Sequence, residues 1–310
     1  MLRTLFSVAL LALVILFVDE EVLFERISAL DPVWVVVALS ATLPQYLLSA
    51  ARWRLTAERL GAILSFRMAL CEYYLAVLTN QILPGGVLGD AARAFRHGYR
   101  LSGHDASPRY GPAVRAVIFE RASGQLVLFL VMLSGLFFWP ARQGEALLFG
   151  IVGMALLIVL IAGASMFFLI RGSLAKSRLG SGAGSLLREA RHALFARGVL
   201  PLQLFYSLSV LATYLFCFYC AGRAIGITMS FAEVIALVPA ILFSMTLPIT
   251  IAGWGIREAS AAAIWGLANL TPADGVAVSV TYGIIVLLSA LPGILFVIPR
   301  SGKADVGDKR

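Results

Sequence analysis

Charged side chains stand beside helix-breaking residues between residues 80 and 96, NQILPGGVLGDAARAFR, in an otherwise apolar part of the sequence. Pro84 and the glycines around it stop a continuous helix and leave backbone N–H groups without partners. A helix that starts after Gly89, with Asp90 as its N-cap, would direct free N–H groups toward an anion. Arg93, one turn further on, adds a guanidinium group, which suits a phosphate. The chemistry predicted here is anion binding.

A second interruption of the same kind lies between residues 247 and 258, LPITIAGWGIRE. In both stretches a glycine follows the proline by five residues, and an arginine and an acid come shortly afterwards. Two arginines at facing half-helix starts, Arg93 and Arg257, would together hold a phosphate. Alternatively, Asp90 with Arg93, and Arg257 with Glu258, form structural ion pairs that lock the ends of the breaks. A third alternative is an interfacial position with no special role, and the sequence leaves all three open.

A third charged group, ERASGQ at residues 120–125, falls inside an apolar run. Ionisable residues in such a run usually face the interior of a helix bundle, so we expect Glu120 to pair with Arg93 or Arg257. Gly124 would allow a broken helix to approach closely; alternatively, the charges reach a membrane interface. The candidate substrate-binding residues are Asn80, Pro84, Gly85, Gly86, Gly89, Asp90, Arg93, Glu120, Arg121, Gly253, Gly255, Arg257 and Glu258.

The pattern of His and Cys residues does not indicate catalysis or metal binding. The three histidines, at 97, 104 and 192, form no ligand motif, and the cysteines at 71, 217 and 220 lie in apolar runs. The cysteines are expected to be small core residues. We therefore expect no enzymatic activity, no metal and no cofactor. Basic residues are not interleaved with aromatic ones, so no nucleic-acid partner is expected either.

The composition indicates an integral membrane protein. Of 310 residues, 60% are hydrophobic and 14% are charged, and the mean hydropathy is +0.90, whereas a soluble domain is about half apolar and a quarter charged. Two apolar regions, 68–92 and 231–268, are interrupted near their middle. Uninterrupted spans of the length that crosses a bilayer are predicted at 3–18, 33–50, 113–139, 146–170, 199–222 and 274–298.

Loop charges predict the orientation of these spans. The 19–32 loop is acidic, while 51–67, 93–115, 171–198 and the 300–310 tail are basic. Because basic loops stay in the cytoplasm, both termini are expected on the cytoplasmic side. The membrane itself is expected to be the cytoplasmic (inner) membrane of a bacterium. Region 68–92 then starts and ends on the same side, which predicts a re-entrant hairpin. Region 231–268 is either a second hairpin or two short spans, and its short second arm favours the hairpin.

The predicted fold is an all-α polytopic membrane protein with about six full transmembrane helices and two broken re-entrant hairpins. Each half has the order helix, helix, hairpin, helix, and the halves start on opposite sides, as in an inverted repeat. The first repeat is 1–139 and the second is 140–298. A basic linker at 171–198, flexible because of its glycines and serines, lies in the second repeat, and residues 299–310 form a cytoplasmic tail.

The three motifs, in this order, resemble the flippase-like transmembrane family that includes the N-terminal membrane domain of lysylphosphatidylglycerol synthases. They are LPGGxxGDxxR from residue 83, ERxxG from residue 120, and LP with GxGxRE ending at residue 258; the resemblance covers about 1–300. In the synthases a soluble aminoacyl-transfer domain follows, and the membrane part is implicated in moving the lipid between leaflets. The resemblance implies a stand-alone member without that domain, and such relatives are associated with hopanoid lipids and polyprenyl-linked sugars.

We therefore expect a lipid translocator that moves an anionic phospholipid, or a polyprenyl- or hopanoid-type lipid, between leaflets. The expected partner is a membrane lipid with an anionic headgroup, and a lipid-synthesising enzyme is a possible second partner. One alternative is a non-catalytic membrane partner of a lipid-modifying enzyme or glycosyltransferase. Another is an integral membrane enzyme that modifies a lipid.

Overall fold

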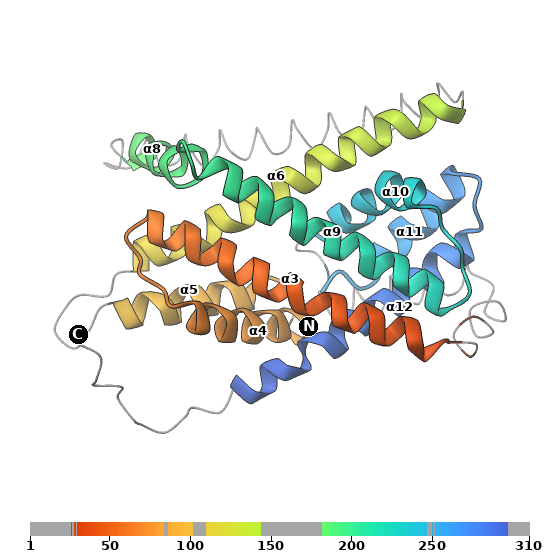
Figure 1. Cartoon of the computed structure of the whole chain (residues 1–310), viewed down its shortest axis with the longest axis horizontal. Coiled ribbons are helices and arrows are strands. Elements are labelled where there is room, and N and C mark those ends of the chain that lie inside the picture. Colours follow the sequence, from red (N-terminus) through yellow and green to blue (C-terminus); the bar gives the residue numbers. More distant parts are fainter. Residues whose placement is uncertain are drawn as a thin grey trace.

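A computed structural model describes residues 26, 28, 30–83, 86–101, 110–143, 182–246, 250 and 252–296 (Figure 1). Within these ranges every regular element is a helix. Pro84, Gly85, the tail and the predicted spans at 3–18 and 146–170 lie outside the described residues. The number of six spans and the inverted repeat therefore stay predictions.

Among the described residues, four helices are long and apolar enough to cross a membrane. At about 1.5 Å per residue, 25 residues reach about 37 Å, which exceeds the roughly 30 Å of a hydrocarbon core. The first of these helices begins where the Asp31 side chain accepts a hydrogen bond from the Val33 N–H group. The four helices are α3 (Pro32–Arg59), α6 (Tyr110–Gln143), α9 (Leu200–Ala224) and α12 (Pro272–Ala290), which continues into the 3-10 helix η1 (Leu291–Phe296).

Both predicted interruptions are breaks between short helices. The first separates α4 (Phe66–Ile82) from α5 (Leu88–Leu101), and the second separates α10 (Phe231–Ser244) from α11 (Ile256–Leu267). The four helices have 17, 14, 14 and 12 residues, fewer than the roughly 20 that cross a bilayer. The backbone of the second break enters the left-handed region at Ala252, Gly253 and Gly255. The two glycines reach this region without a steric cost, whereas Ala252 does not.

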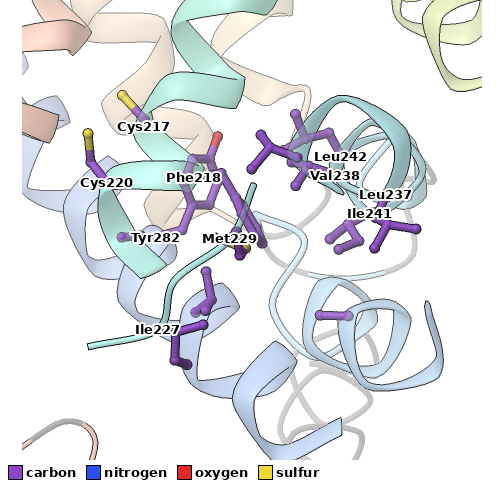
Figure 2. Close-up of a cluster of buried hydrophobic side chains, with 14 of the residues drawn as sticks. Cys217, Phe218, Cys220, Ile227, Met229, Leu237, Val238, Ile241, Leu242 and Tyr282 are labelled. Carbon is purple, nitrogen blue, oxygen red and sulfur yellow. The ribbon is translucent and has the colours of Figure 1, made fainter. Parts of the chain in front are cut away.

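The helices pack so that the two breaks are held between the long helices. α3 lies along α9, α6 contacts both α5 and α10, and α12 contacts α11 and α9 (Figure 1). The larger core cluster surrounds Phe218 and Tyr282, whose ring centroids are 5.3 Å apart (Figure 2). Cys217 and Cys220 lie in this cluster as free, buried thiols, in agreement with their predicted role as core residues.

Residues 171–181 of the predicted flexible linker lie outside the described residues, and most of its remainder forms α8 (Gly182–Phe195). Ala193 and Leu194 are buried against Phe119 of α6, and Glu189 pairs with Arg115 at 2.6 Å. Small and apolar residues that recur at helical spacing give this segment one packing face, so this part of the linker docks as a helix. The division into repeats at 1–139 and 140–298 stays a prediction.

Candidate functional site

One cavity of about 710 Å³ lies between the two helix breaks. Asn80, Gly86 and Asp90 line it from the first break, and Thr250 and Gly253 line it from the second. The remaining walls come from α3, α6, α9 and α12. The fold therefore brings the two interruptions, more than 150 residues apart in the sequence, against a common space.

A chain of five charged side chains stands at one wall of this cavity. Glu120, which is fully buried, accepts hydrogen bonds from Arg52 at 2.5 Å and from Arg93 at 2.8 Å. Asp90 accepts from Arg93 at 2.9 Å and from Arg121 at 2.8 Å. The alternating chain joins α3, α5 and α6, and its three guanidinium groups and two carboxylates leave one positive charge uncompensated.

Aromatic rings shelter the central arginine of this chain. The guanidinium carbon of Arg93 lies 4.4 Å from the ring centroid of Trp53 and 4.8 Å from that of Tyr73. A buried cation is costly unless it is paired, and the two carboxylates and two ring faces together supply that compensation. Arg93 is 0% exposed, so it holds the wall together from behind and does not line the cavity.

Asn80, and not Asp90, caps the start of α5. Its side-chain oxygen accepts a hydrogen bond from the Gly89 N–H group at 2.7 Å, and its amide nitrogen donates to Asp90 at 3.1 Å. The predicted N-cap role of Asp90 is wrong because α5 already begins at Leu88, which places Asp90 in the first turn. A carboxylate there still benefits from the helix dipole.

Gly89 is required by the close approach of α5 to α4. A Cβ atom at this position would collide with the backbone carbonyl of Ala76. A carbonyl in the middle of a helix cannot move aside cheaply, so a larger residue would push the two arms of the first break apart. The sequence placed Gly89 among the site residues as a helix breaker, whereas the structure uses it for packing.

The charged pair of the second break is closed on itself. Glu258 accepts from Arg257 at 2.6 Å and from the Gly255 N–H group at 2.6 Å. Ser279 of α12 bridges the pair, accepting from Arg257 at 2.9 Å and donating to Glu258 at 3.0 Å. Arg257 also lies near the rings of Trp254 and Tyr282. The side chains of Arg257 and Glu258 are at most 1% exposed. Their neighbour Tyr282 lines the cavity.

These contacts change the predicted site. Arg93 and Arg257 do not face each other across an open anion site, because each is enclosed in its own ion pairs. Of the two predicted partners of Glu120, Arg93 is the one it contacts, and Glu120 is fully buried between helices. Arg121, whose side chain is 35% exposed, is the predicted arginine that reaches the cavity.

Gly124 makes room for a different neighbour from the one predicted. A Cβ atom there would collide with the guanidinium group of Arg52, so Gly124 admits the side chain of α3 and not a broken helix. Gly253 lines the cavity, while Gly255 holds Glu258 through its N–H group. Gly86 lines the cavity at a φ of +61°.

Arg52 was missed because it was counted among the charges of a cytoplasmic loop at 51–67. In the structure α3 continues to Arg59, and Arg52 is 4% exposed and paired with Glu120. A signal was present, since α3 carries polar residues three or four positions apart, which places them on one helix face. These are Thr42, Gln45, Ser49, Arg52 and Thr56, all buried.

A second, shorter polar series on α9 faces the same region. Ser207 accepts a hydrogen bond from Arg52 at 3.1 Å, and Gln203 donates to Thr56 at 2.9 Å. Ser207 and Tyr214 also line the cavity. These residues went unnoticed because single polar residues in an apolar helix carry little weight until a partner helix is known.

The helices and the charged cavity define a polytopic helical membrane protein with a polar site between two broken helices. The chain belongs to the family described as the lysylphosphatidylglycerol synthase TM region, which it matches over residues 1–293. This match confirms the resemblance seen in the three sequence motifs. No curated protein and no solved structure matches the chain.

Proposed function

We propose that the protein moves a lipid between the two leaflets of a bacterial cytoplasmic membrane and does not modify it chemically. The lipid is an anionic phospholipid or a lipid of the polyprenyl or hopanoid type. The observation that carries the proposal is the cavity between the breaks, which has a charged wall and otherwise largely apolar walls. A lipid has the same two parts, a polar headgroup and apolar chains.

The short helices support this proposal. Each arm of the two breaks is shorter than a membrane crossing, so we propose that both pairs are re-entrant and meet within the membrane. Irregular backbone at that depth is tolerated where it lines a cavity, and both breaks line this one. Apolar side chains exposed on the outside of α3 and α9, among them Val36, Leu43, Phe205 and Leu208, would contact lipid chains.

Transfer between leaflets can be measured directly with purified protein in vesicles that contain a lipid labelled on its acyl chain. A reductant added outside bleaches the outer leaflet, and the protein is expected to expose the inner pool faster than empty vesicles do. Ala91→Trp fills the cavity from α5 and is expected to return the rate to background. Ala122→Trp, at an exposed position of α6 that does not line the cavity, is the matched control.

Equal rates in protein-containing and empty vesicles, for every lipid class, would overturn this proposal. That result would favour the alternative of a non-catalytic membrane partner. Full activity of Ala91→Trp would show that a lipid crosses elsewhere on the protein and would remove the cavity from the mechanism.

A further inference from the structure

We propose that the cavity selects lipids whose headgroup is a singly charged phosphodiester carrying hydroxyl groups, and that it rejects headgroups carrying an amine. This inference rests on the proposed function, since it takes the ligand of the cavity to be a lipid. It concerns the headgroup alone, so it can succeed or fail separately from translocation.

The net charge of the charged cavity wall is the first argument for this selectivity. Arg52, Arg121 and Asp90 line the cavity, and Arg93 and Glu120 stand behind them in the same chain of ion pairs. Three cations against two anions leave a surplus of one positive charge. A phosphodiester, with one negative charge, balances this surplus, whereas a pyrophosphate exceeds it and a neutral lipid leaves it uncompensated.

The carboxylates of the wall are already fully engaged. Glu120 contacts Arg52 with one oxygen and Arg93 with the other. Both oxygens of Asp90 contact Arg121; one also accepts from Arg93 and the other from Asn80. An ammonium group needs acceptors, preferably an anion. Among the described residues that line the cavity, no other carboxylate is present, so an amine would find only neutral acceptors there and would add to the surplus positive charge of the wall.

Among the described residues that line the cavity, three have a polar side-chain atom without a hydrogen-bond partner. These atoms are the Nε atom of Arg121, the side-chain oxygen of Gln125 one turn further along α6, and the hydroxyl of Thr250 in the second break. Thr250 is 2% exposed, and buried polar atoms normally find partners. Because a hydroxyl both donates and accepts, a hydroxylated headgroup can satisfy Gln125 and Thr250 while its phosphate meets Arg121.

Two lipid sources share this chemistry, namely a phosphoglycerol phospholipid and a polyprenyl phosphate joined to a sugar. The full chain is therefore presented with phosphatidylglycerol, phosphatidylethanolamine, lysyl-phosphatidylglycerol and a polyprenyl phosphohexose in mixed detergent micelles. Lipid retained by the protein is measured by native mass spectrometry, and the same lipids are then compared in the vesicle assay.

We expect phosphatidylglycerol or the phosphohexose to be retained at least tenfold more than either amine lipid, and whichever is retained better identifies the source. Equal retention of all four lipids, or preference for an amine lipid, would overturn the inference. Selective retention without transfer would support the headgroup selectivity and count against translocation. Transfer of all headgroups at one rate would support translocation and count against the selectivity.

Matched variants separate the charge from the hydroxyl contacts. Arg121→Gln is expected to lower retention of phosphatidylglycerol about tenfold, and Arg121→Lys to recover part of it. Thr250→Val and Gln125→Leu are expected to keep the preference for an anion but to lose a severalfold preference for phosphatidylglycerol over phosphatidylmethanol, which lacks the hydroxyls. Arg54→Gln removes an arginine whose ion pair with Glu58 is exposed and serves as the control.

Selectivity that persists unchanged in Arg121→Gln would overturn the assignment of the phosphate to this side chain. Each variant is first checked for a monodisperse elution profile in detergent. If Arg121→Gln does not fold, Thr250→Val still decides the hydroxyl contacts, because it replaces the hydroxyl with a methyl group of similar size and leaves every ion pair intact.

Discussion

The two helix breaks look alike in the sequence but are built differently. At the first, Asp90 takes part in a chain of ion pairs that crosses three helices and reaches the cavity through Arg121. At the second, Arg257 and Glu258 are neighbours on one helix, bridged by Ser279 and covered by aromatic rings.

This difference separates two uses of a buried charge. A chain that ends in a partly exposed arginine can exchange a partner for a ligand, so the first break is suited to recognition. A pair whose hydrogen bonds are satisfied within its own cluster keeps a fixed geometry, so the second break is suited to support. The comparison predicts that changes at the first break alter lipid handling and that changes at the second alter stability alone.

The largest expected effect comes from removing the acid at the centre of the first chain. Glu120→Gln leaves the buried Arg52 without a charged partner and leaves Arg93 with Asp90 alone, and breaking a buried pair costs about 3 to 5 kcal/mol. Glu258→Gln unpairs one arginine, which keeps Ser279, so its loss should be smaller. Thermal unfolding in detergent, followed by fluorescence-detected size exclusion, ranks the two variants. An equal or reversed order would show that the number of arginines losing an acid does not determine the cost.

A smaller loss is expected from Gly89→Ala, which places a methyl group against the backbone of α4. Overpacking of this kind costs about 1 to 3 kcal/mol. Gly86→Ala is the matched change in the same break, since nothing lies within 4 Å of a Cβ there and only the positive φ opposes it. The unfolding midpoints of the two variants test this, and a lower midpoint for Gly86→Ala would show that backbone strain outweighs close packing.

Two serines sharpen the comparison at a still smaller scale. Ser279→Ala removes a group that both donates and accepts within the closed pair, at a cost of about 1 to 2 kcal/mol. Ser207→Ala removes one acceptor from Arg52, at a site that lines the cavity, where water can replace it. We expect Ser279→Ala to lower the unfolding midpoint more, and Ser207→Ala to change the transfer rate more. A change of transfer rate confined to Ser279→Ala would reverse the assigned roles.

The smallest effect is expected at the pair of Arg54 and Glu58, which is exposed on α3. Surface pairs contribute about 0 to 1 kcal/mol, so Glu58→Gln should leave both the unfolding midpoint and the transfer rate close to those of the unchanged protein. A large loss would mean that this end of α3 contacts something that the isolated chain does not contain.

The sequence by itself determined the membrane class, the long apolar helices that the structure describes and the positions of both breaks. These are local properties, because apolar run length and the conformations of proline and glycine depend on few neighbours. The pairing of Glu120 with Arg93 was also predictable, since an acid inside an apolar helix requires a cation and few were available.

Only the tertiary structure decided which charges face the cavity. Arg52 and Arg121 reach it while Arg93 and Arg257 are enclosed, and nothing in the spacing of these arginines distinguishes them. That outcome depends on how α3, α6 and α9 cross, because the rotation of a helix about its axis decides whether a side chain points toward a ring, a carboxylate or an open space. The sequence thus supplied the charged groups, and the packing of helices distant in the chain assigned their roles.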